Sequence, residues 1–136
     1  MTKRIEIEIQ TRGRGFYLIT PQIIRQLGEL PASGMINFFL QHTSAALTIN
    51  ENADPDVPKD LVSFFDHQCP DGTPYFNHTL EGSDDMPAHV KSSILGVSLT
   101  IPIHEKRLDM GIWQGIYLCE FRNSPHTRKI IATIFE

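Results

Sequence analysis

The sequence lacks the features that would tie it to a membrane or an oxidising compartment. Only 2 cysteines occur in 136 residues, and neither belongs to a Cys-x-x-Cys pair. A disulfide framework and a thiolate metal site are therefore unsupported. No apolar run approaches the roughly 20 residues of a transmembrane helix, and no apolar stretch follows the charged N-terminus as in a secretory signal. We expect a cytoplasmic protein that does not bind membranes.

Positive charge is also scarce. The chain has 12 Lys and Arg against 16 Asp and Glu, a formal net charge of −4. Nucleic-acid binding depends on clusters of basic side chains that neutralise phosphates, and only short basic pairs such as Lys3-Arg4 and Arg128-Lys129 are present. We therefore expect no nucleic-acid partner. The 40% of hydrophobic residues suffices for one domain, residues 1–136, with its own core.

Apolar periodicity predicts short strands and helices in mixed order. Strict alternation or short apolar runs, typical of strands, occur at 4–9, 35–41, 45–49, 97–103, 112–121 and 129–135. Helical spacing with start and stop residues occurs at 20–28, 60–65 and 86–96. These elements favour an α+β fold, with two packed antiparallel sheets and helices at one side.

Polar residues that can carry chemistry concentrate between positions 42 and 91. His42 ends a predicted strand, His78 precedes an acidic turn, and His89 lies in the first turns of a predicted helix. Three histidines on three different elements can converge into a metal site with an open position, and imidazole suits zinc. Their spacing matches no short metal motif, so each can equally be a structural or surface residue.

Two charged residues have both a catalytic and a structural interpretation. Glu51 lies in the acidic loop 50–56 and can act as a general base, or simply belong to a solvated turn. Lys91, with Ser92 and Ser93, can contact a phosphate near the start of a helix, or be exposed. Asp84 and Asp85 are better explained as charges that favour the N-terminus of that helix. Trp113, between two glycines, can flank a ligand or belong to the core.

Three longer blocks then show a resemblance to a known family. Residues 42–56 read HTSAALTINENADPD, residues 78–93 read HTLEGSDDMPAHVKSS, and residues 111–121 read GIWQGIYLCEF. The blocks resemble the signatures of the YjbQ-like family, in the same order and across nearly the whole chain. This resemblance implies an α+β subunit with a two-sheet β-sandwich and flanking helices, assembled as a homotrimer, with a polar pocket at or near the subunit boundaries.

The resemblance also implies site residues and an activity. Its histidine-bearing blocks carry over onto His42, His78 and His89 as metal ligands, and its acidic loop onto Glu51. With Lys91 as a second catalytic candidate, the candidate substrate contacts are Ser44, Ser92, Ser93, Trp113 and Gln114. Members are often described as secondary thiamine-phosphate synthases, which implies a small phosphorylated ligand and a divalent metal.

Three hypotheses remain open from the sequence. The first is a thiamine-phosphate-synthase-like transferase, in which a divalent cation such as Mg²⁺ neutralises pyrophosphate. Mg²⁺ prefers oxygen ligands, however, and a three-histidine site favours zinc. The second hypothesis is therefore a zinc-dependent hydrolase, with Glu51 as the base. The third is a trimeric module that binds a metal or a small molecule without catalysis.

Overall fold

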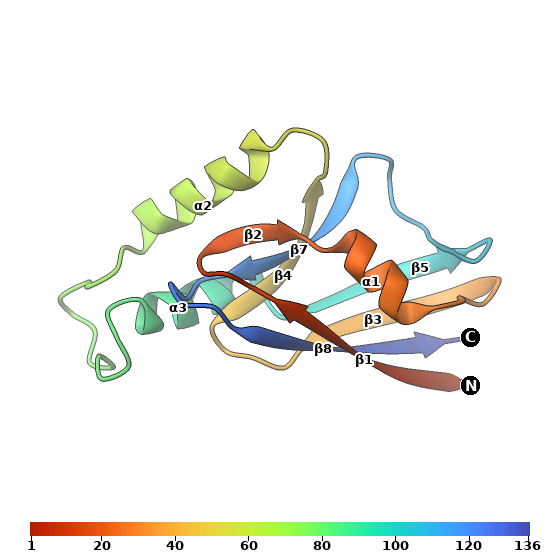
Figure 1. Ribbon diagram of the computed structural model, residues 1–136, viewed down its shortest axis with the longest axis horizontal. Helices are drawn as coiled ribbons and strands as arrows, with labels where there is room; N and C mark the ends of the chain where they lie inside the picture. Colours follow the sequence, from red (N-terminus) through yellow and green to blue (C-terminus); the bar gives the residue numbers. More distant parts are fainter.

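The computed structural model describes all residues, 1–136, and consists of two antiparallel sheets and three helices (Figure 1). The larger sheet has the order β1 (Thr2–Gln10), β8 (Thr127–Phe135), β3 (Ser33–Leu40), β5 (Ser98–His104) and β6 (Arg107–Leu108). The smaller sheet has the order β2 (Gly15–Leu18), β7 (Gln114–Glu120) and β4 (Ala45–Glu51). The helices are α1 (Thr20–Leu27), α2 (Asp56–Gln68) and α3 (Asp85–Leu95).

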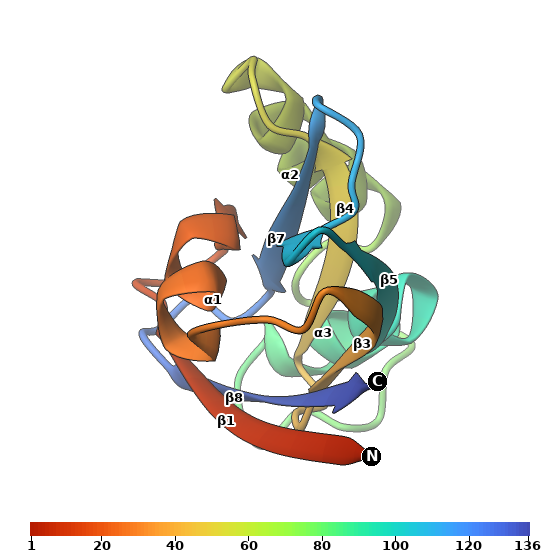
Figure 2. The ribbon, with the colours of Figure 1, turned by 90° about the vertical axis from the view of Figure 1, so that its right-hand side faces the viewer.

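The main core lies between the two sheets. It contains 18 buried residues, which follow the alternation of the strands, as in Ile7 and Ile9 of β1 or Ile36 and Phe38 of β3. The inward side of the small sheet contributes alternate residues such as Leu118 of β7. In Figure 2 the strands β4 and β7 cross the direction of β1 and β8, so the two sheets pack at a steep angle. The termini lie together because β1 pairs with β8 along their whole length.

The small sheet is buried on its second face as well. There Ala46, Tyr117 and Cys119 form a separate cluster with Ala88 of α3 and Phe121. Because α3 packs on β4 and α2 packs on β2, the two helices shield this face from water. α1 instead contacts β1 and β7. The longest helix has 13 residues, and no helix combines the length and apolarity of a membrane-spanning segment.

The predicted α+β fold with two antiparallel sheets is confirmed. Some details differ. β7 begins only at Gln114, so Trp113 precedes the strand and is 63% exposed rather than in the core. Glu51 belongs to the end of β4 instead of the following loop, because it pairs with Gln114 across the sheet. The strands β2 and β6, of 4 and 2 residues, were not predicted because such short segments show no periodicity.

Candidate functional site

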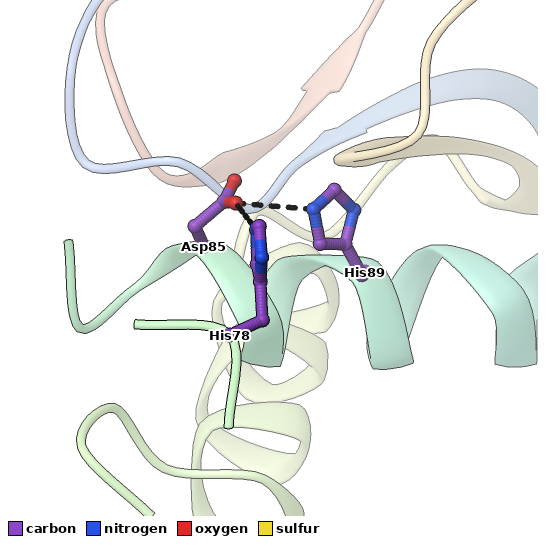
Figure 3. Close-up of side chains that lie close together, drawn as sticks. All are labelled: His78, Asp85 and His89. Atoms are coloured by element: carbon purple, nitrogen blue, oxygen red, sulfur yellow. Dashed lines mark hydrogen bonds and ion pairs between the residues drawn. The ribbon is translucent and has the colours of Figure 1, made fainter. Parts of the chain in front are cut away.

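Two histidines and a carboxylate meet at the N-terminus of α3 (Figure 3). Asp85 is the first residue of α3, and His89 follows four residues later, so both side chains lie on the same face of the helix. His78 comes from the loop that precedes α3. Both rings point toward the Asp85 carboxylate, with Nε2–Oδ2 distances of 2.8 Å for His78 and 3.1 Å for His89. We call these three residues the triad.

The triad is closed on the protein side and open on the other. The Asp85 side chain is 2% exposed, whereas those of His89 and His78 are 29% and 46% exposed. One potential ligand atom from each residue lies within 4.8 Å of the others. Three ligand atoms this close together, with an open side toward solvent, could hold a metal ion and leave a position free.

An arginine fixes the Asp85 carboxylate from behind. Arg122 Nη1 lies 2.9 Å from Asp85 Oδ1, and Arg122 Nε donates to Asp84 Oδ2 at 3.0 Å. Burial raises the pKa of Asp85, but the hydrogen bond to His78 and the charges of His89 and Arg122 outweigh it, so this pKa lies below its usual range. Asp85 is therefore ionised, and Oδ2, the oxygen that Arg122 does not hold, faces the two imidazoles.

The backbone fixes the orientation of His89. Its Nδ1 lies 2.8 Å from the carbonyl oxygen of Thr43. Because a carbonyl oxygen only accepts hydrogen bonds, Nδ1 carries a proton and donates. In a neutral ring, Nε2 then has a lone pair directed at Asp85 Oδ2. The pair is stabilised only if a cation, either a proton or a metal ion, lies between the nitrogen and the oxygen.

The structure brings together His78 and His89 of the three predicted ligands, and His42 lines the same cavity as His89 without belonging to the triad. His42 Nε2 accepts a hydrogen bond from the backbone N–H of Lys129 at 2.8 Å, so this nitrogen is not available to the triad. Asp85 takes the third position in its place. The sequence analysis assigned Asp85 only to the helix terminus. An Asp and a His four residues apart on one predicted helix face was the signal that could have identified it.

The two predicted catalytic residues do not face the triad. Glu51 is at the opposite end of β4 from Ala45, which is bonded to α3, a separation of about 20 Å along the strand. Lys91 is buried on α3 and its Nζ lies 2.8 Å from Asp66 Oδ1 of α2. The same ammonium lies 5.6 Å from the centroid of the Phe121 ring. Lys91 is thus neither exposed nor free for a phosphate.

The predicted substrate contacts fall into two groups. Ser92 and Ser93 of α3 line a cavity of about 650 Å³ together with His89 and His42. The hydroxyls of both serines donate to backbone carbonyls, of Ala45 and His89 respectively. The others lie away from this cavity: Ser44 is bonded to Arg128, and Trp113 and Gln114 are exposed at the Glu51 end of the small sheet.

The triad separates two hollows in the surface. His89 belongs to the cavity of about 650 Å³ just described, whose other walls are formed by residues 39–43 and 96–97. His78 lines a smaller pocket of about 250 Å³ formed by the loop 72–83 and the start of α3. Neither lining contains a lysine or an arginine. A ligand at the triad can therefore extend into uncharged surroundings on either side.

Comparison with known proteins agrees with the resemblance seen in the sequence blocks. The profile of the family described as UPF0047 protein YjbQ-like matches residues 4–136. UPF0047 protein YjbQ of Escherichia coli O157:H7 is 47% identical over 130 residues, which cover 94% of each chain. UPF0047 protein YugU of Bacillus subtilis strain 168 is 46% identical over 98 residues, 71% of this chain and 70% of that one.

Two crystal structures share the fold. The conserved hypothetical protein TT1486 from Thermus thermophilus superposes with a TM-score of 0.86 at 33% identity, covering 96% of this chain and 99% of the other. An uncharacterized conserved protein of the YjbQ/UPF0047 family from Clostridium acetobutylicum gives a TM-score of 0.82 at 37% identity, with the same coverage. From the profile, the sequence identities and the shared fold together, we conclude that the chain belongs to the UPF0047 (YjbQ-like) family.

Proposed function

We propose that this chain is a metal-dependent hydrolase whose divalent ion, zinc in the first place, is held by His78, Asp85 and His89. The observation that carries the proposal is the pairing of His89 Nε2 with Asp85 Oδ2 at 3.1 Å, while Nδ1 donates to the Thr43 carbonyl. When the His89 ring is neutral, these two atoms both accept hydrogen bonds, and a metal ion between them satisfies both, as a proton on Nε2 does in the charged ring. Two imidazoles and one carboxylate suit zinc and related transition metals.

The dimensions of the triad support this assignment. Zinc bonds of about 2.0–2.2 Å in a tetrahedron separate neighbouring ligand atoms by about 3.3 Å. The distances of Asp85 Oδ2 from the two histidine nitrogens are 2.8 and 3.1 Å, so a small rotation of the rings makes room for an ion. The surroundings also fit, because metal-binding imidazoles commonly donate their other N–H to a carbonyl, as His89 does.

Each residue then has a distinct role. A zinc ion bound here would lower the pKa of a bound water to about 7 and supply a nucleophile at neutral pH. Asp85, oriented by Arg122, contributes the negative charge that favours the cation. Thr43 keeps the His89 lone pair on Nε2. The exposed side of His78 leaves room for water and substrate. Glu51 is too distant to act as the base in this arrangement.

The thiamine-phosphate-synthase-like transfer remains a second proposal, which rests on the family resemblance alone. Its phosphate contacts were expected at Lys91, Ser92 and Ser93, but Lys91 pairs with Asp66 and both hydroxyls donate to carbonyls. The triad also offers two nitrogen ligands, whereas Mg²⁺ prefers oxygen. The geometry therefore supports the hydrolase more strongly than a transferase for small phosphorylated metabolites.

Self-association, as in the expected homotrimer, is part of the proposal. The outer face of the large sheet exposes Met35, Phe39 and Phe135 by 42–47%. Met35 pairs with Phe135 and Phe39 pairs with the half-buried Ile131, while the polar pair Asn37 and Thr133 lies between them on the same face. Exposed apolar pairs rimmed by polar residues are typical of a contact surface. Sedimentation of the wild type and of Phe39→Lys would show whether this face holds copies of the chain together.

Metal analysis tests the hydrolase. After equilibrium dialysis against zinc, we expect one ion per wild-type chain and substoichiometric zinc in His78→Ala and His89→Ala. His42→Ala should keep its zinc, because its Nε2 is bonded to Lys129 and not to the triad. Loss of zinc from His42→Ala, or full zinc in both other variants, would exclude this ligand set. Stoichiometric zinc with no turnover of any ester, amide or phosphoester would instead favour the non-catalytic binding module.

A further inference from the structure

The cavity beside His89 has a chemical character that narrows the substrate. Ten residues line it, and none is a lysine, arginine, aspartate or glutamate. Part of the wall is apolar, with Phe39, Leu40 and Val97. Its volume of about 650 Å³ lies in the range of small-molecule sites. In the metal-free protein, none of these ten side chains offers a phosphate or carboxylate a charged partner to replace its hydration, whereas an uncharged ligand needs none.

His42 has one hydrogen-bond donor, and its other ring nitrogen determines that this donor is Nδ1–H. Its Nε2 accepts the backbone N–H of Lys129 at 2.8 Å, so the proton of the neutral ring is on Nδ1. No group of the protein accepts a hydrogen bond from this Nδ1–H. Burial and the positive charges of Arg128 and Lys129 lower the pKa of His42, which keeps the ring neutral. His42, which lines the cavity, thus carries an uncharged donor that has no partner within the protein.

We propose that the cavity binds an uncharged carbonyl compound, an ester or amide with an apolar substituent, whose carbonyl oxygen accepts the Nδ1–H of His42. The apolar substituent packs against Phe39 and Val97, whose side chains are accessible, whereas Leu40 is buried in the core. Because His89 belongs to both the cavity wall and the triad, the bound compound lies beside the proposed metal ligands. This inference names the substrate class of the proposed hydrolase and therefore rests on that proposal. His42 is here a substrate-binding residue, in place of the metal ligand expected from the sequence.

Two substitutions at the same position separate the donor from the fold. In His42→Gln, the longer amide reaches the position of Nε2 and still accepts the Lys129 N–H, but no donor remains at the position of Nδ1. In His42→Asn, the shorter amide keeps a donor near Nδ1 and gives up the bond to Lys129. If the donor binds the ligand, Gln loses binding and Asn retains it. If His42 acts only through its bond to Lys129, the order is reversed.

The test uses two probes of similar size and opposite charge character. Acetanilide is an uncharged amide, and phenyl phosphate carries the same ring on an anion. Each is titrated into the full-length, metal-free protein and followed by NMR of the backbone amides and the imidazole nitrogens. We expect acetanilide to shift the signals of His42 Nδ1, Gly96 and Val97, and phenyl phosphate to leave them unchanged. His42→Gln should weaken acetanilide binding about three- to tenfold, the usual effect of one hydrogen bond. His42→Asn should bind within about twofold of the wild type.

Several outcomes would overturn the inference. They are phenyl phosphate binding in this cavity as tightly as acetanilide, acetanilide causing no shifts there, or His42→Gln binding like the wild type. The exposed His104→Gln serves as the control and should bind like the wild type. Because these titrations need no metal, their failure is distinct from a failure to bind zinc, which is measured on the same samples. In zinc-loaded protein, His42→Gln should raise KM for p-nitrophenyl acetate by a similar factor.

Discussion

Two of the carboxylates that arginines hold in place, Glu120 on β7 and Asp85 on α3, have different surroundings. The Glu120 and Arg128 side chains are 0% and 3% exposed. Both oxygens of Glu120 accept hydrogen bonds from the protein: from Arg128 on each, from the Thr11 hydroxyl on Oε1 and from the Arg122 backbone on Oε2. Arg128 also donates to Ser44. This pair leaves no capacity for a ligand.

Only one oxygen of Asp85 is held by an arginine. Arg122 holds Oδ1, whereas Oδ2 faces two imidazoles, one of which has its proton committed to Thr43. The side opposite the protein is open, since His78 is 46% exposed. A buried charge whose partners are all internal holds the fold in one arrangement, and one that faces acceptors at the surface is suited to binding a cation. We therefore expect Glu120 to stabilise the fold and Asp85 to bind a cation.

We call Glu120 and Arg128 the closed pair. The largest expected effect comes from removing the arginine of this pair. Arg128→Met keeps an unbranched side chain but leaves Glu120 as an unpaired buried charge, which should lower the free energy of unfolding by about 3–5 kcal/mol. Urea denaturation at pH 7 measures this loss. Arg107→Met, at an exposed position, is the control and should change stability by less than about 0.5 kcal/mol. A loss below about 1 kcal/mol for Arg128→Met would show that the interior tolerates the charge.

For the triad, we expect stability to depend on bound zinc, and the histidine variants to differ from the wild type in how much zinc stabilises them. Zinc at 100 times its dissociation constant should stabilise the wild-type protein by about 2.7 kcal/mol, because the ion binds only the folded chain. The stabilisation should vanish in His78→Ala and persist in His67→Ala, which alters an exposed histidine of α2. Thermal unfolding with and without zinc gives the comparison. Equal zinc stabilisation of His78→Ala and wild type would contradict the proposed ligands.

Local signals made much of the fold predictable. Strict alternation at residues 4–9 identified β1, Pro21 and Gly28 bounded α1, and Gly96 ended α3, where its N–H bonds to the Ser92 carbonyl. These features depend on neighbours within a few residues. The sequence predicted two antiparallel sheets but not which strands pair, because pairs such as β3 with β8 join segments about 95 residues apart.

The site was predictable in part, for the same reason. His78 and His89 were candidates because histidines in polar loops and helix starts suggest ligands. His42 was grouped with them, but it is not part of the triad, and its Nε2 accepts the backbone N–H of Lys129, 87 residues away. Lys91 looked exposed, and only the packing of α2 on the small sheet brings Asp66 to it. Long-range contacts decide which polar residues are free, and a single sequence does not contain them.

Removing the charge of Lys91 should cost less stability than removing that of Arg128, because its partner Asp66 is partly exposed to solvent. Asp66 is 34% exposed and keeps Arg14 at 3.0 Å when Lys91 is removed. Lys91→Met should therefore lower the free energy of unfolding by only about 1 kcal/mol, while its apolar stem keeps its contact with Phe121. Urea denaturation beside Lys59→Met, an exposed control on α2, measures the effect. A loss near that of Arg128→Met would place Lys91 with the closed pair.

The smallest expected effect is the pH response of His42, which lies between the two regions. Burial first, and then the charges of Arg128, His126 and Lys129, lower its pKa below the ordinary 6.5, while Glu120 acts in the opposite direction. The unfolded chain therefore binds more protons than the folded chain at pH below 6.5, so His42 reduces stability as the pH falls through that range and has no effect above it. His42→Gln does not titrate and keeps an acceptor for Lys129.

Urea denaturation of both proteins from pH 7.5 to 5 should show their difference in unfolding free energy shifting in favour of His42→Gln as the pH falls. The other histidines are common to both chains, so their contributions cancel to first order. Lys129→Gln removes one of the charges that lower the pKa and should flatten the slope of the wild type without abolishing it. A difference that is constant with pH would mean that the fold does not lower the pKa of His42, and a shift toward the wild type in acid would mean that the fold favours the protonated ring. In a protonated ring Nε2 donates a hydrogen bond, and the Lys129 N–H then no longer fixes the donor on which the cavity's preference for a carbonyl depends.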